Sequence, residues 1–310
     1  MGSIRNACTM NKDIRFDRLA LAAVALLATA FICSSTANAS MIGPVDLGTA
    51  GNFTMLALTG GIDDSGPLTG AYTVNGQVGV ASPGQKFSAS GSVKYAGPIY
   101  LHTGDTFQSS APGVPSPQMS AAIDSMLAKA KADAFAASNF ASSLAATATY
   151  GTINNTMSIT ENSVGNYVFN INTISFSGGK TLTLDAPTGS NYILNVSGSI
   201  TLSPGSIVLA GGLTSANVLI NYTGTKDIQF SGGGNASVIY GTLLAPNVTV
   251  GLHPGEIVGS LIAGGITMSS GAVVVPEVTP SSVIFGFIGL VVAFGSRRSL
   301  MARVRAAGKA

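Results

Sequence analysis

An internal repeat of 18 residues near the end of the chain most constrains its fold. The segment 241–245 (GTLLA) recurs as 259–263 (GSLIA), and the segment 247–250 (NVTV) recurs as 265–268 (GITM). Eighteen residues fit one turn of a three-sided β-solenoid, with about six residues on each face including its corner. The repeat therefore predicts coils that stack in register, with apolar residues such as Leu243 pointing inward.

Short strand-like segments occupy the rest of residues 40–275. They are four to seven residues long, rich in β-branched residues and separated by Gly, Ser, Thr and Asn. A partial copy, 199–203 (SITLS), resembles 265–269 (GITMS) at an offset of 66, so the coils differ in length. We predict an all-β-dominated domain over 40–275, a right-handed β-solenoid. A β-sandwich is the alternative, because it also has many short strands.

One segment breaks this β pattern. Residues 116–145 are rich in Ala, contain no Gly, and place apolar residues at helical spacing. Ser116 suits the N-cap position, and Pro117 follows at the first helical position. We therefore predict one long α-helix whose apolar side packs against the flank of the solenoid.

The first 39 residues have the pattern of a secretory signal peptide. Basic residues up to Arg18 precede an apolar run at 19–33, which predicts a short hydrophobic helix. Ala37 and Ala39 form an A-x-A signal for cleavage before Ser40. The alternative is a membrane-spanning helix, which needs about 20 apolar residues. Both cysteines lie in this segment, so the predicted mature chain contains no thiol.

The end of the chain predicts a second short hydrophobic helix, over 283–295, followed by a basic tail that starts at Arg297 and Arg298. Such a segment is marginal for spanning a membrane, and basic residues behind it favour a cytoplasmic tail. An ordinary C-terminal anchor is one interpretation.

A short motif precedes this hydrophobic segment and suggests another interpretation. Val275, Pro276 and Glu277 stand before the apolar residues, and the order of motif, hydrophobic helix and basic tail in 276–310 resembles the PEP-CTERM sorting signal. Val278 replaces the usual second proline of that motif. The resemblance implies export, transient anchoring in the membrane through the C-terminal helix, and an exosortase-type processing enzyme as partner.

Charge and side-chain chemistry exclude several function classes. From 40 to 275 there are six Lys, no Arg and ten acidic residues, a net charge of 6 − 10 = −4, so nucleic acid is not an expected partner. Only His102, near Asp105 in an expected loop, and His253, at an expected turn, offer imidazole bases. We predict no catalytic residues, no metal and no cofactor.

Three further motifs are interpreted as loops or turns. Residues 63–66 (DDSG) offer oxygen ligands for calcium, but known calcium-loop spacings are absent, so we expect a solvated loop. Residues 178–180 (GGK) precede a strand-like segment rather than the helix that a phosphate-binding loop requires. Residues 232–234 (GGG) are also expected to form a turn.

The middle of the chain resembles two families of exported β-solenoid proteins. The segments 45–58 (VDLGTAGNFTMLAL) and 240–250 (YGTLLAPNVTV) resemble both of them. The element 244–247 (LAPN) and the coil 259–263 (GSLIA) are most similar to the choice-of-anchor A, or collagen-binding-like, family. The similarity to the ice-binding β-solenoid family, whose members open similarly and carry a comparable helix, is weaker. Both resemblances imply a β-solenoid with an Ala-rich helix and no catalytic residues.

These observations predict a non-enzymatic, exported and envelope-anchored protein of the cell surface or extracellular matrix. Adhesion to exopolysaccharide or other surface polymers is the expected role. The first alternative is ice binding, for which Thr249 and Thr267, stacked by the repeat, are the candidate surface face. The second alternative is a polysaccharide-active β-helix enzyme that uses paired carboxylates.

Overall fold

The computed structural model describes residues 41–66, 73–232 and 236–276. The predicted signal peptide, with Ala37, Ala39 and Ser40, lies outside these residues. So do Glu277, the predicted helix 283–295, and the basic tail with Arg297 and Arg298. Within the described ranges, no helix is both long and apolar enough to cross a membrane.

Most of the described chain is β-strand, with one α-helix. The elements in chain order are β1 (Met41–Ile42), β2 (Val45–Asp46), η1 (Gly48–Asn52), β3 (Phe53–Ala57), β4 (Ile62–Ser65), β5 (Thr73–Val74), β6 (Gln77–Val80), β7 (Lys86–Ser90), β8 (Lys94–Tyr95), β9 (Ile99–Tyr100), β10 (Thr106–Ser109), α2 (Ala121–Ser143), β11 (Ala148–Ile153), β12 (Met157–Thr160), β13 (Asn166–Ala186), β14 (Asn191–Gly211), η2 (Ser215–Asn217), β15 (Val218–Tyr222), β16 (Ile228–Ser231), β17 (Ser237–His253), β18 (Gly255–Ser269) and β19 (Val273–Val275).

The strands form the coils of a β-solenoid, as predicted. Apart from the small β1–β2 pair, the strand pairings are parallel, and each coil contributes strands to three faces. We call the face that includes β3, β6, β9, β11 and β15 the helix face. The open face includes β4, β7, β10 and β16, and the third face includes β12, β19, β5 and β8. The long strands β13, β14, β17 and β18 bend around the corners and contribute to all three faces.

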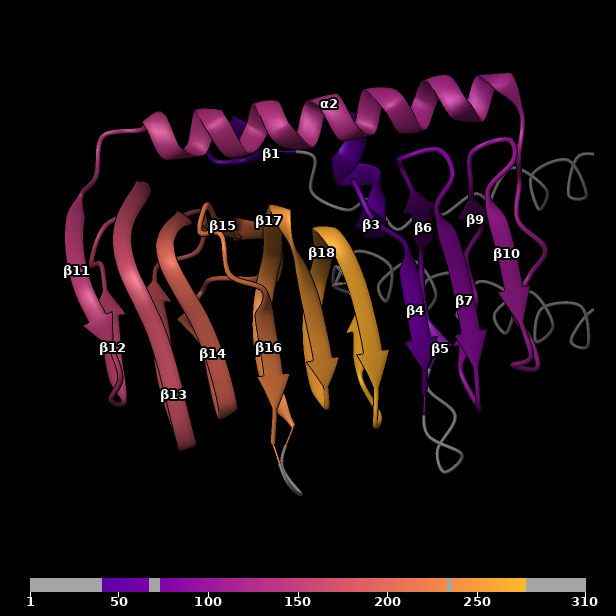
Figure 1. The fold of residues 1–310 in the computed structure, drawn as a ribbon. Helices are drawn as coiled ribbons and strands as arrows, with labels where there is room; N and C mark the ends of the chain where they lie inside the picture. The colour runs from indigo at the N-terminus through magenta and orange to yellow at the C-terminus, as the bar shows by residue number, and fades with distance from the viewer. Residues whose placement is uncertain (1–40, 67–72, 233–235, 277–310) are drawn as a thin grey trace, which may run out of the picture. The chain divides into compact units, whose positions relative to one another are not determined.

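The coils do not stack in the order of the chain (Figure 1). The C-terminal coil, β18, pairs with β17 on one side and with β3 and β4 on the other. The coils of β6–β7 and β9–β10 continue beyond β4, while those of β13 and β11 lie at the opposite end. Helix α2 runs along the solenoid and carries the chain from one end to the other. The last coil therefore joins two halves that are far apart in sequence.

Inward side chains from successive coils form the main core. Leu243 pairs with Leu261, and Leu261 pairs with Met55, so one apolar column crosses the joint between the two halves. All three side chains are fully buried. Gly259 has a φ of +143°, and a Cβ there would overlap the carbonyl oxygen of Gly241. Close packing at this corner therefore requires glycine.

Helix α2 is shorter than the predicted helix 116–145, and it starts at Ala121. Its N-cap is Ser120, whose Oγ accepts a 3.3 Å hydrogen bond from the Ile123 amide. The predicted start at Ser116 and Pro117 is wrong because the backbone of Gln118 pairs with the sheet. The Gln118 amide donates to the Ile99 carbonyl at 2.8 Å, and the Gln118 carbonyl accepts from the Leu101 amide at 3.1 Å.

The buried side of α2 packs on the helix face, as predicted, and forms a second core. Buried amides add polar contacts beside this core. Asn221 Nδ2 donates to the Ser138 carbonyl at 3.0 Å and to Asn195 Oδ1 at 2.9 Å, while Asn221 Oδ1 accepts from Ser138 Oγ at 2.6 Å. Asn195 Nδ2 donates to the Ala141 carbonyl at 2.8 Å. These bonds fix the C-terminal half of α2 on β14 and β15.

Candidate functional site

The open face presents an outward row of side chains, one from each of eight coils, which we call the central rank. Strand register places them side by side, and parallel strands are spaced about 4.8 Å apart. In spatial order the central rank consists of Ser175, Thr201, Gln229, Gly251, Thr267, Asp63, Ser88 and Gln108. Seven of the eight positions carry a polar side chain, so the open face can form hydrogen bonds along its length.

Thr249 and Thr267 share the open face but do not stack. Thr249 pairs with Gly265, and Thr267 pairs with Gly251. The predicted offset of 18 holds at Ala245, which pairs with residue 263, but falls to 16 at Thr249, which pairs with residue 265. The corner after Ala245 has two more residues than the corner after residue 263, so the repeat slips by two residues at this point. The predicted stacking is therefore wrong.

A hollow of about 240 Å³ opens on this face next to the central rank. Its lining includes Gly61, Asp63, Lys86, Thr249, Gly265 and Thr267. Both threonines of the candidate surface face therefore contribute to one site, although they lie in different rows.

Asp63 and Asp64 point to opposite sides of strand β4, so the expected solvated loop at 63–66 is wrong. Asp63 is exposed, whereas Asp64 is 1% exposed and its Oδ2 accepts a 2.7 Å hydrogen bond from the Tyr95 hydroxyl. Burial raises the pKa of Asp64 to about 6 and raises that of Tyr95 well above its usual value. The two carboxylates cannot hold one ion, and the described residues contain no cluster of three or more metal-ligating side chains.

His253 lies at the corner between β17 and β18, as expected. Its Nδ1 is 2.7 Å from Ser269 Oγ, and its Nε2 is 3.2 Å from Thr267 Oγ1. Nucleophilic catalysis by a serine and a histidine also needs a group that orients the ring. Both ring nitrogens of His253 contact hydroxyls instead. Asp63 is the single carboxylate in the central rank, so that row does not supply the pair that glycoside hydrolysis uses.

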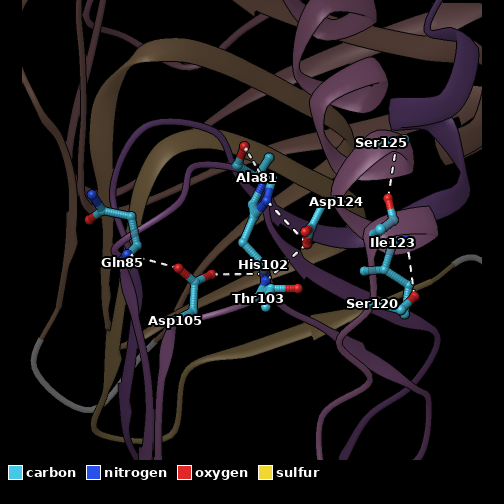
Figure 2. A network of polar contacts seen from close by, with 10 residues as sticks. Ala81, Gln85, His102, Thr103, Asp105, Ser120, Ile123, Asp124 and Ser125 are labelled. Atoms are coloured by element: carbon cyan, nitrogen blue, oxygen red, sulfur yellow. Dashed lines mark hydrogen bonds and ion pairs between the residues drawn. The ribbon is translucent and has the colours of Figure 1, made fainter.

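His102 connects the start of α2 to neighbouring coils (Figure 2). Its Nε2 is 3.1 Å from the Ala81 carbonyl oxygen, and its Nδ1 is 3.4 Å from Asp124 Oδ1. A carbonyl oxygen can only accept, so Nε2 carries a proton and is not available as a base. A hydrogen bond from the Thr103 amide, together with the nearby His102, lowers the pKa of Asp124.

Asp105 holds the same loop through its carboxylate. Its Oδ2 accepts from the His102 amide at 2.9 Å, and its Oδ1 accepts from the Gln85 amide at 3.1 Å (Figure 2). Both oxygens are therefore used by backbone donors. The geometry gives His102 and Asp105 a structural role in linking coils.

The glycine-rich motif at 178–180 forms a solenoid corner. Gly178 and Gly179 have φ values of 66° and 80°, and β13 continues through Lys180 without a helix. The expected turn is confirmed. Of the motif at 232–234, only Gly232 lies within the described residues. Val275, the first residue of the proposed sorting motif, pairs with Val258 of β18, in the coil that joins the two halves, and Pro276 is buried directly after it.

Sequence reasoning missed the hollow and the roles of Asp63 and Lys86 in its lining. One signal pointed to this face. The partial copy at an offset of 66 relates Thr201 to Thr267, and these two residues do lie in the same row. The position of β4 beside β18 was not visible, because the two segments are about 200 residues apart.

The sequence matches a family model described as "Putative Ice-binding-like adhesive domain" over residues 35–274. It matches no curated protein. The fold is similar to a domain of an ice-binding protein from Shewanella frigidimarina, with 19% sequence identity and a TM-score of 0.55, covering 76% of this chain and 98% of that chain.

Two fungal structures are also similar. An ice-binding protein from the Antarctic ascomycete Antarctomyces psychrotrophicus has 21% identity and a TM-score of 0.50, covering 76% of this chain and 99% of that chain. An ice-binding protein from an Arctic yeast has 21% identity and a TM-score of 0.51, covering 76% of this chain and 95% of that chain. At these identities the similarity shows a shared fold.

Proposed function

Since this chain belongs to the ice-binding-like adhesive domain family, we propose that it is a non-enzymatic surface protein that adheres to polysaccharide through its open face. The central rank carries this proposal, because seven of its eight positions present a polar side chain. A polymer lying across the coils meets a hydrogen-bonding group about every 4.8 Å. Many weak contacts along one chain then add up to firm adhesion.

Sequence features at the two ends of the chain support a location at the cell surface. The predicted signal peptide, with expected cleavage between Ala39 and Ser40, supports export. The PEP-CTERM-like segment at 276–310 supports transient anchoring in the envelope and processing by an exosortase-type enzyme. We propose exopolysaccharide at the cell surface or in the matrix as the polymer that the open face meets.

Ice binding is the second candidate, favoured by the ice-binding proteins among the similar solved structures. Ice is a regular lattice, so a surface that matches it must repeat the same flat side chains at a fixed spacing. In the central rank, Gln229 and Asp63 interrupt the small residues, and Thr249 and Thr267 stand in different rows. We therefore rank polysaccharide adhesion first.

One variant pair tests the open face. Thr201→Tyr places a bulky ring in the central rank, while Thr183→Tyr makes the same change on the third face, where Thr183 pairs with Val208. Binding to immobilised acidic and neutral polysaccharides should weaken by roughly tenfold for Thr201→Tyr and stay unchanged for Thr183→Tyr.

Thermal hysteresis and ice recrystallisation are measured on the same samples. Ice activity that is lost in Thr201→Tyr, with no polysaccharide binding by the unmodified protein, would establish the second candidate instead. Sensitivity to Thr183→Tyr alone would move the binding surface to the third face.

A further inference from the structure

The hollow on the open face is formed by residues at the joint between the two halves of the solenoid. Thr249, Gly265, Gly61 and Lys86 follow one another across four adjacent coils, next to the central rank. The two glycines leave the outer layer of side chains empty over two strands, which produces the cavity of about 240 Å³. A cavity of this size accommodates one sugar ring rather than a drug-sized molecule, for which pockets begin at about 300 Å³.

Opposite charges line this hollow without neutralising each other. Lys86 and Asp63 are both exposed, and across the described part of the chain the ion pairs involve other residues. Both charges therefore remain available to a ligand. Thr249 and Thr267 add two hydroxyls, one of which, Thr267 Oγ1, is already placed 3.2 Å from His253 Nε2.

We propose that the hollow binds one uronate residue of an acidic polysaccharide, with its carboxylate at Lys86 and its ring hydroxyls donating to Asp63. The carboxylate of Asp63 accepts hydrogen bonds only, which suits neighbouring sugar hydroxyls. A compact dianion such as phosphate would be repelled by Asp63, so the ligand must combine a single negative charge with neutral donors. The inference rests on the proposed function, since it names the polymer that the open face meets.

The two glycines differ in a way that allows a direct test. A Cβ on Gly61 would overlap the Lys86 carbonyl oxygen, so this position cannot be changed without moving the backbone. A Cβ on Gly265 would have Thr249 Oγ1, at 3.2 Å, as its nearest neighbour, and Gly265 has no left-handed φ. In Gly265→Gln the new Cβ therefore requires only a small shift of the Thr249 side chain, and the rest of the glutamine fills the hollow. Gly151→Gln is the matched control, because nothing lies within 4 Å of a Cβ at that position on β11.

The experiment measures binding of the full chain to a tetra-uronate and to its carboxyl-reduced, neutral counterpart by titration calorimetry. Lys86→Met should weaken uronate binding by roughly tenfold and leave the neutral ligand unaffected, because only the uronate carries a charge for it. Lys94→Met, an exposed lysine on the third face, should change neither. Gly265→Gln should abolish binding of both ligands, and Gly151→Gln should bind as the unmodified protein does.

The outcomes separate this inference from the proposed function. Polysaccharide adhesion that is sensitive to Thr201→Tyr but unaffected by Gly265→Gln would overturn the uronate site and leave the open face as the adhesive surface. Equal affinity for the uronate and its neutral counterpart, or preference for an amino-sugar oligomer, would also overturn it. Absence of binding to every polysaccharide would remove both. Matching thermal unfolding curves show that each variant is folded.

Discussion

At the scale of single residues, the inward carboxyl of Asp64 links stability to pH. Its pKa rises from 3.8 to about 6 on burial, so the folded state holds this proton more tightly than the unfolded state. The contribution of Asp64 to stability is then greatest below about pH 4, falls as the pH rises to about 6, and levels off above it, with a loss of about 3 kcal/mol. Asp64→Asn should remove this fall and be more stable than the unmodified protein at pH 8, measured by urea unfolding across this range. Asp63→Asn, at the neighbouring exposed carboxyl, should keep most of this fall, because burial contributes more to the raised pKa of Asp64 than the charge of Asp63 does. An unchanged pH profile in Asp64→Asn would show that another group titrates.

Residue patterns in the sequence indicated the chemistry of the site better than its geometry. The turn at His253 could be inferred directly, and His253 does lie at the corner between β17 and β18. The row to which each threonine belongs could not, because it depends on how many residues each corner holds. Two extra residues after Ala245 are enough to separate Thr249 from Thr267. Strand alternation predicts opposite directions for Asp63 and Asp64, but only once 62–65 is identified as a strand rather than a loop.

At the scale of elements, helix α2 is held to the solenoid by buried amides as well as by apolar contacts. Asn221→Val would leave Ser138 Oγ and Asn195 Oδ1 without the partners they have now. Unsatisfied buried groups are costly, so the free energy of unfolding should fall by about 2–4 kcal/mol, measured by chemical denaturation. Asn155→Val, at an exposed amide, is the control and should change it by less than about 0.5 kcal/mol. Equal midpoints for both variants would mean that apolar packing alone holds α2.

The existence of this helix and of the strands was predictable because each has its own period in the sequence. Its start was not, because Gln118 pairs with Ile99 and Leu101, which are distant from the helix pattern. The repeat identified β17 and β18 as neighbouring coils correctly. The order of the coils could not be predicted from the sequence, because, like the start of α2, it depends on contacts between segments that are distant in the chain. The pairing of β18 with β3 and β4 joins segments that have no local signal for each other.

At the scale of the whole solenoid, the position of β18 makes the C-terminal coil the joint on which both halves depend. Ile266 lies between Val250 of one half and Ile62 of the other, whereas Ile99 lies in the outer coil and pairs only with Val78 among the named strands. Both side chains are almost fully buried, at 1% and 0% exposure, so truncation to Ala leaves a similar cavity.

In a solenoid each coil stabilises mainly its neighbours. Ile266→Ala should therefore lower global stability by about 2–5 kcal/mol and reduce hydrogen-exchange protection in β17 and β4 together. Ile99→Ala should reduce protection only near β9 and β6. If Ile266→Ala reduced protection on one side of β18 alone, the two halves would be independent units, and the hollow between Thr249 and Lys86 would lie across a flexible joint rather than on one rigid face.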